Sequence, residues 1–146
     1  MERLLIVGKG DIIDVIKREY PENMHIGYSD FTGEHFCSYR KILFVGAIGI
    51  CVRSIAPYIK DKHTDPAVVC ADSKGVNVIS VLSGHIGGAN LLAKEIAAVV
   101  GGDAVITTQS DNAGMWALDT LGAKFGWETY TNTPGLNGPI ATYVNG

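Results

Sequence analysis

The residues best suited to chemistry lie in one segment, VISVLSGHIGGANLLAKEIA, which spans residues 78–97. An apolar run leads into a glycine-rich turn at residues 83–88, and the pattern of an amphipathic helix follows directly. Glycine permits backbone conformations closed to other residues and lets a ligand approach the main chain. Because a helix begins with unpaired N–H groups, this glycine turn predicts a site for an anion such as a carboxylate or a phosphate.

Two side chains in the glycine turn are candidates for catalysis. His85 suits the role of general base, because the pKa of an unperturbed imidazole lies near neutrality. Ser83 is the second candidate: it would attack as a nucleophile with His85 as its base, or its hydroxyl would only stabilise the turn. The glycine spacing matches neither a P-loop nor the dinucleotide fingerprint, so close packing is the alternative explanation for these glycines.

Composition narrows the function classes. The chain has 146 residues, of which 47% are hydrophobic and 18% charged, as expected for a compact domain. A net charge of -3 offers no basic surface for nucleic acid, and no apolar run approaches the roughly 18 residues that span a membrane. With no signal peptide, the chain is expected in the cytoplasm. Its histidines and cysteines lack metal-ligand spacing, so no protein-held metal is expected, while Cys51 and Cys70 lie in apolar runs typical of buried thiols.

Strand and helix patterns alternate along the chain. Three apolar stripes predict helices: Ile12 to Ile16, then Ile48 with Val52, Ile55 and Ile59, and finally residues 89–100. Pro57 predicts that the second helix either kinks or begins near Ser54. A tight turn at residues 72–75 predicts a hairpin, and a last helix is expected after Asp111. Strands are predicted at residues 4–7, 24–28, 42–45, 66–71, 76–82, 104–107 and 127–131.

This alternation predicts an α/β fold, a three-layer sandwich with a mostly parallel sheet and helices on both faces. Residues 1–131 are expected to form the domain, and residues 132–146 a linker or frayed tail. Ligands of such sheets bind at the carboxyl ends of the strands. That edge is expected to collect residues 8–10, 46–49, 83–88 and 107–108, which suits a ligand with many carboxylates.

Three segments in order closely resemble the CbiG family, the cobalt-precorrin-5A hydrolases of anaerobic cobalamin biosynthesis. They are VRSIAPYIKDKHTDPAVV (residues 52–69), residues 78–97, and VITTQSD (residues 105–111), and the resemblance extends over residues 42–119. One departure is Gln109, where the family suggests a smaller residue. The resemblance implies that a ring A δ-lactone is opened and acetaldehyde released. It also implies a substrate with many acetate and propionate arms that carries its own cobalt, so that no further cofactor is expected.

Members of that family continue into a C-terminal domain. The resemblance therefore implies an N-terminal domain that works with a CbiG C-terminal domain or with a fused corrin-pathway methyltransferase. The alternatives are a non-catalytic domain that binds the corrin intermediate or a partner enzyme, and a generic sugar-phosphate or nucleotide binder.

The residues expected to bind substrate fall into three groups. Main-chain amides of the glycine turn would stabilise an oxyanion, and Arg53 and Lys60 would pair with carboxylates unless they are ordinary surface charges. Two threonines would donate hydroxyls to the ligand or cap a helix. The full set is Gly49, Arg53, Lys60, Gly84, Gly87, Gly88, Asn90, Thr107 and Thr108.

Overall fold

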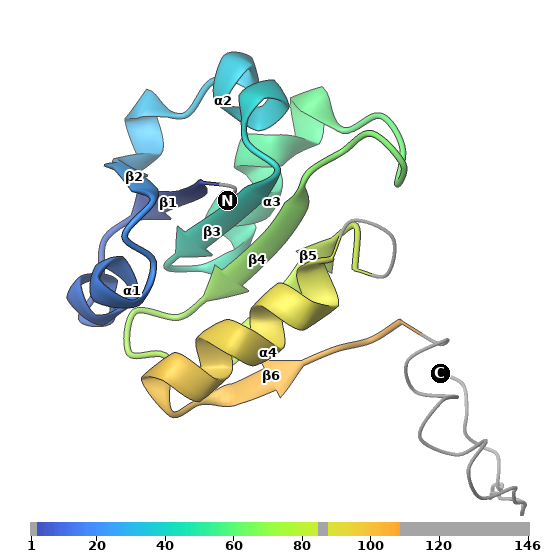
Figure 1. Ribbon diagram of the computed structural model, residues 1–146. Helices are drawn as coiled ribbons and strands as arrows, with labels where there is room; N and C mark the ends of the chain where they lie inside the picture. Colours follow the sequence, from blue (N-terminus) through green and yellow to red (C-terminus); the bar gives the residue numbers. More distant parts are fainter. Residues whose placement is uncertain (1–2, 85–87, 109–146) are drawn as a thin grey trace, which may run out of the picture. The chain divides into compact units, whose positions relative to one another are not determined.

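The computed structural model describes residues 3–84 and 88–108 (Figure 1). The chain divides into two units, Met1–Ile106 and Thr107–Gly146, and the strands and helices given below belong to the first. The predicted helix after Asp111, the strand at 127–131 and the boundary at 131 lie outside the described residues. They stay predictions.

Six strands form one sheet in the order β2-β1-β3-β4-β5-β6. Each lies within two residues of its predicted ends. Neighbouring strands are parallel except β4 and β5, whose arrows point in opposite directions in Figure 1. The predicted hairpin is therefore confirmed. The strands are β1 (Leu4–Gly8), β2 (Asn23–Ile26), β3 (Lys41–Val45), β4 (Ala67–Ala71), β5 (Asn77–Leu82) and β6 (Asp103–Val105).

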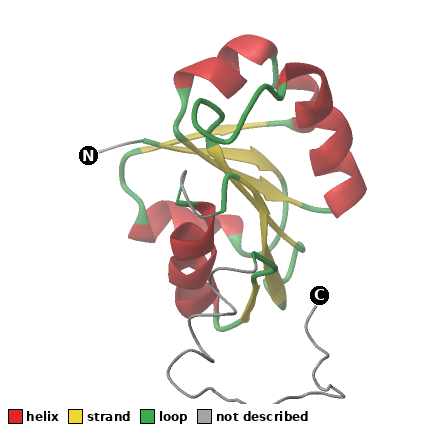
Figure 2. Cartoon of the chain, turned by 90° about the vertical axis from the view of Figure 1, so that its right-hand side faces the viewer, coloured by secondary structure: helices red, strands yellow, loops and turns green. Residues whose placement is uncertain are grey.

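Helices cover both faces of this sheet, which confirms the three-layer α/β prediction (Figure 2). Helices α1 (Ile13–Glu19) and α4 (Ala89–Val100) pack on one face, and α2 (Gly33–Ser38) and α3 (Ile48–Ile55) pack on the other. Two 3-10 helices, η1 (Tyr28–Asp30) and η2 (Ala56–Tyr58), complete the second layer. Strands β1 and β4 are buried along their whole length, as expected for parallel strands covered on both sides.

Helix α4 follows its predicted apolar stripe. Leu92, Ala93 and Ile96 are buried against the sheet, and each large aliphatic side chain contributes about 1.5–3 kcal/mol on burial. Glycines in the left-handed conformation stand at both ends, with Gly88 at φ +90° and Gly101 at φ +75°. Between these two glycines the helix extends for 12 residues, the longest in the described part of the chain. No helix in residues 3–84 or 88–108 is long and apolar enough to cross a membrane.

Helix α3 departs from its prediction in two ways. Of the predicted stripe only Ile55 is buried, while Ile48, Val52 and Ile59 are 44%, 46% and 43% exposed. Cys51 takes the second core position instead. The alternative start near Ser54 is wrong as well: the α-helix ends before Pro57, and a 3-10 turn follows. That change of winding keeps the proline ring away from the carbonyl four residues earlier.

The second layer also contains a helix that sequence patterns did not reveal. Helix α2 has six residues, too few to show a helical period. Its start is stabilised by a capping box in which Thr32 and His35 satisfy each other's backbone amides.

The predicted burial of two thiols is confirmed. Cys51 on α3 and Cys70 on β4 are both inaccessible to solvent. Their mutual hydrogen bond, together with burial, raises the pKa of the Cys51 thiol.

Candidate functional site

The glycine turn lies at the edge of the sheet where β1, β3 and β4 begin, which we call the amino edge. Strand β5 is antiparallel to β4, so its carboxyl end, and that of β6, point to this edge. The turns after β1 and β3 lie at the opposite, carboxyl edge. The expected convergence of residues 8–10, 46–49 and 83–88 is therefore wrong, because the hairpin reverses the chain before the glycine turn.

The predicted substrate-binding residues are divided between these two edges. Gly49 lies in the first turn of α3 at the carboxyl edge, and the Nη1 of Arg53 is 3.3 Å from the position that a Cβ on Gly49 would occupy. Lys60 lies beyond η2, on the way to β4. No single helix joins Arg53 to Lys60, since α3 ends at Ile55 and η2 ends at Tyr58.

The carboxyl edge has its own cavity of about 590 Å³ beside β1 and β2, with Lys9, Ser29 and Asp30 in its lining. There the Nε2 of His25 is 2.8 Å from the carbonyl oxygen of Gly8. Ser83, the candidate catalytic residue that the structure describes, does not belong to this lining.

At the amino edge, Asp65 joins three segments that are far apart in the sequence. Its side chain is only 3% exposed, and its two carboxylate oxygens accept the backbone N–H of Lys60 at 3.1 and 2.9 Å. Its carbonyl oxygen accepts hydrogen bonds from the Nη2 of Arg40 at 2.9 Å and from the hydroxyl of Ser83 at 3.3 Å. The Nη1 of Arg40 donates to the carbonyl of Thr64 at 2.9 Å. The loop 60–65, the start of β3 and the end of β5 are thus held together.

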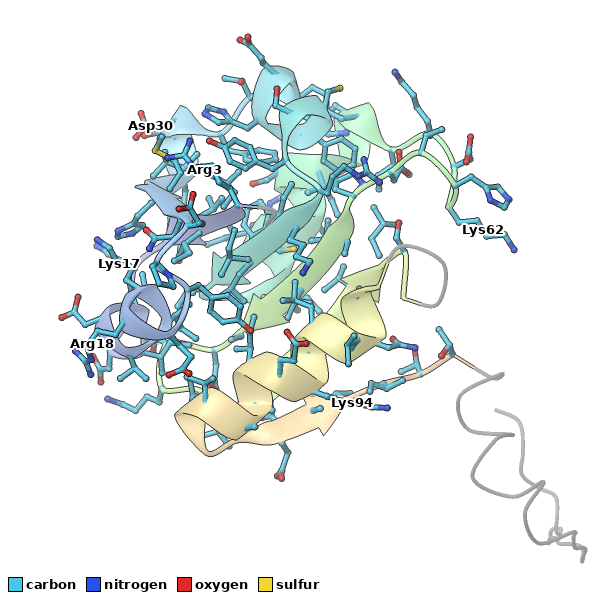
Figure 3. All side chains as sticks on the ribbon, viewed as in Figure 1. Arg3, Lys17, Arg18, Asp30, Lys62 and Lys94 are labelled. Carbon is cyan, nitrogen blue, oxygen red and sulfur yellow. The ribbon has the colours of Figure 1, made fainter. Side chains whose placement is uncertain are left out.

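The loop 60–65 adds exposed charge to this edge. Lys62 projects from its tip (Figure 3), and Lys60 and His63 are exposed beside it. The backbone N–H groups of His63 and Thr64 donate to the carboxylate of Asp61, and these hydrogen bonds lower its pKa. The amino edge therefore presents cations from a loop whose own acidic groups are occupied by main-chain amides.

The glycine turn is closed by two backbone hydrogen bonds. The amide of Ala89 donates to the carbonyl of Ser83 at 3.1 Å, and the amide of Asn90 donates to the carbonyl of Gly84 at 2.9 Å. The expectation that the first amides of this helix are unpaired is wrong for these two residues. Between the described ends of the turn, His85 and Gly87 lie outside the described residues.

Two further residues that were predicted to bind substrate, Asn90 and Gly88, have different surroundings. The Oδ1 of Asn90 accepts the hydroxyl of Ser80 at 2.7 Å, and the buried Asn90 side chain joins α4 to β5. Within the part of the chain that the structure describes, no atom lies within 4 Å of the position of a Cβ on Gly88, so the main chain is open to a ligand there. Thr107 and Thr108 belong to the second unit and stay predictions.

Ser83 is the single non-glycine residue with a positive φ, +60°, in the described ranges 3–84 and 88–108. An L-residue pays about 1–2 kcal/mol for this left-handed conformation. Its hydroxyl is buried and donates to the carbonyl of Asp65. This geometry favours the turn-stabilising role for the hydroxyl, and the catalytic role of Ser83 stays a prediction.

At position 83 we expect glycine to cost less stability than alanine, the reverse of their usual order. Ser83→Ala loses the hydrogen bond to Asp65 and keeps the strain, whereas Ser83→Gly loses the same bond and relieves the strain. We expect Ser83→Gly to exceed Ser83→Ala by about 1 kcal/mol in the free energy of unfolding, measured by urea denaturation. An alanine variant as stable as the glycine variant would contradict the left-handed conformation.

Metal-binding groups do not gather at either edge in the described part of the chain. No three His, Cys, Asp or Glu side chains in residues 3–84 and 88–108 are placed to hold one ion. Of the groups that do cluster, sequence reasoning missed Arg40 and Asp65. They lie 25 residues apart, and no local pattern pairs them.

Comparison with known proteins decides the family. A family model described as cobalamin synthesis G N-terminal matches residues 30–111, more than half of the chain. The chain belongs to this family. The family segment includes both the loop 60–65 and the glycine turn, and the membership confirms the resemblance that the sequence motifs predicted.

Relatives in the family have assigned names. Proteins named cobalt-precorrin-5A hydrolase from Priestia megaterium and Salmonella typhimurium are 54% and 50% identical over 92 and 95 residues, or 63% and 65% of this chain. These matches cover 25% and 27% of the relatives, so the chain spans about a quarter of their length. The crystal structure of a cobalamin biosynthesis protein G homolog from Sulfolobus solfataricus is 31% identical, with a TM-score of 0.62, over 78% of this chain and 40% of that chain.

Proposed function

We propose that this chain is the N-terminal part of a cobalt-precorrin-5A hydrolase and that its amino edge contacts the corrin substrate. The observation that carries the proposal is the identity of 50–54% with proteins of that name. The exposed cations of the loop 60–65 support it, because a substrate with many carboxylate arms favours a cationic surface. Asp61 and Asp65 form hydrogen bonds to main-chain amides and, within the described residues, no ion pair with Lys60 or Lys62, so both ammonium groups are available to a carboxylate.

In the proposed reaction, His85 removes a proton from a water molecule as the water oxygen attacks the lactone carbonyl. The acyl–oxygen bond then breaks, and the leaving alkoxide takes up a proton. Such a base contributes about a hundredfold to ten-thousandfold in rate. Amides of Gly87 and Gly88 would stabilise the oxyanion, and Ser83 is retained as the alternative nucleophile. His85 alternatively assists the later carbon–carbon cleavage that releases acetaldehyde.

The proposal extends to the surroundings of the reaction. We place the protein in the cytoplasm, with no resident cofactor, because the cobalt arrives with the substrate. Its partner is the rest of the hydrolase, a CbiG C-terminal domain, or a fused corrin-pathway methyltransferase. A second candidate function is a corrin-binding domain without catalysis, favoured by the fact that the chain spans about a quarter of its relatives.

Anaerobic incubation with cobalt-precorrin-5A tests the proposal, with acetaldehyde followed by a coupled alcohol dehydrogenase. We expect release by the wild type and a loss of about a hundredfold or more in His85→Ala. His25→Ala is the matched control, because His25 lies at the opposite edge, and it should retain the wild-type rate. Corrin binding without acetaldehyde would establish the non-catalytic function, and neither binding nor release would overturn both.

A further inference from the structure

A pocket of about 540 Å³ opens at the amino edge, beside the starts of β1 and β3 and against α2. The described residues of the glycine turn, Ser83, Gly84 and Gly88, are not in its lining, and no sequence motif pointed to it. Its lining consists of Arg3, Glu34, His35, Ser38, Tyr39 and Arg40.

Strand register explains why two arginines meet in this pocket. Leu4 of β1 is paired with Lys41 of β3, so the preceding residues, Arg3 and Arg40, are neighbours on adjacent strands. Successive side chains of a strand point to opposite faces. Leu5 packs with the α2 face of the core, so Arg3, two residues earlier, lies on that same face. Two guanidinium groups are therefore directed to the side of the sheet that α2 covers.

The two arginines differ in what they already bind. Arg40 donates to the carbonyls of Thr64 and Asp65, which orient its guanidinium but leave its charge unneutralised. Arg3 is exposed at the start of β1 (Figure 3), and within the described residues it has no hydrogen bond or ion pair. Arg3 is thus free to pair with an incoming anion, beside a second fixed positive charge.

His35 supplies an oriented donor in the same pocket. Its Nδ1 accepts the backbone N–H of Thr32 at 3.1 Å, so the neutral ring carries its proton on Nε2. The ring is stacked between Phe31 and Tyr39, with centroid distances of 6.0 and 6.4 Å. These contacts hold the ring in one orientation, and Nε2–H is left as a donor.

Arg40 also connects this pocket to the glycine turn. The carbonyl of Asp65 that accepts from Arg40 accepts from Ser83 as well. The pocket and the first residue of the turn are therefore two hydrogen bonds apart. A ligand with several carboxylate arms has the form needed to occupy both places.

We propose that this pocket binds one carboxylate arm of the corrin substrate, with Arg3 as its principal ligand and His35 as a second donor. The inference rests on the proposed function and adds the subsite that recognises the arm. Glu34, the one acidic group among the described residues of the lining, opposes the binding of an anion.

Equilibrium binding tests this subsite without any turnover. The probe is a cobalt corrin whose side arms are free carboxylates, and its fully methylated ester serves as the uncharged counterpart. We expect the acid to bind and Arg3→Ala to weaken it roughly tenfold, which corresponds to about 1.4 kcal/mol. Glu34→Gln, which removes the opposing charge, should tighten binding several-fold. The ester should bind weakly and respond to neither change.

Arg18→Ala is the matched control, because it removes the same charge from the exposed side of α1 (Figure 3) and should bind like the wild type. Equal weakening by Arg3→Ala and Arg18→Ala would reduce the effect to net charge and overturn the subsite. The subsite would also be overturned if the corrin acid does not bind, or if Arg3→Ala weakens the binding of citrate but not that of the corrin acid. Acetaldehyde release by the wild type, measured separately, would leave the proposed function standing in each of these cases.

Discussion

Replacement of Gly46 by alanine is expected to lower the free energy of unfolding by about 2–5 kcal/mol. Gly46 has a φ of +141°, a conformation that L-residues rarely adopt. A Cβ at this position would also overlap the hydroxyl of Tyr28, which donates a hydrogen bond to the carbonyl of Val45. The variant must therefore strain its backbone and displace a bonded side chain, and urea denaturation measures the sum.

Two controls separate these costs. Gly101 has a positive φ of +75°, and no described atom lies within 4 Å of the position of a Cβ. Gly101→Ala should therefore lower the free energy of unfolding only by the cost of the backbone conformation, about 1 kcal/mol. In Gly46→Ala combined with Tyr28→Phe, the overlapping oxygen is gone, and the two losses should not add. A Gly46→Ala variant no less stable than Gly101→Ala would show that Tyr28 does not fill this position.

The second large effect is expected at Arg40. Arg40→Ala leaves the carbonyls of Thr64 and Asp65 without their charged donor, and we expect a loss of about 2–4 kcal/mol in the free energy of unfolding. The loop 60–65 should loosen with it, because Asp65 is held by Arg40 on one side and holds Lys60 on the other. Hydrogen exchange at the Lys60 amide, bonded to the Asp65 carboxylate, reports that loosening.

The guanidinium shape, and not the charge alone, is responsible for this effect. Arg40→Lys keeps the charge but cannot donate to two carbonyls in the same fork, so it should recover only part of the loss. Arg18→Ala removes an exposed arginine and should stay within about 0.5 kcal/mol of the wild type. If Lys60 exchanges at the same rate in Arg40→Ala and Arg18→Ala, the arginine does not support the loop.

Patterns of neighbouring residues predicted the strands and the ends of the longest helix. Apolar runs located the strands, and glycines in the left-handed conformation mark both ends of α4 where the sequence placed them. Helix α2 is too short to show a period. On α3 the predicted stripe misplaced the buried face, which is formed by Cys51 and Ile55, and the 3-10 turn at Pro57 removes Ile59 from the helix. Cys51, which the predicted stripe did not include, lies in the core where larger aliphatic residues were expected.

The candidate site was predicted less completely than the fold. Ser83 and Gly88 were predicted from the local sequence pattern, since all residues of the glycine turn are contiguous in the chain. Arg40 and Asp65 were missed because their hydrogen bond depends on the order of β3 and β4 in the sheet. The hairpin was predicted, yet the edge to which it sends the glycine turn becomes evident only when the strands are paired in space.

The direction of β6 has a consequence for covalent assembly. Because β6 is parallel to β5, the polypeptide leaves the sheet at the same edge as the glycine turn. In longer relatives, any domain joined after β6 would be attached at the rim of the candidate site. For short linkers, attachment beside a site raises the effective concentration of the attached group to the order of millimolar, without any affinity of its own.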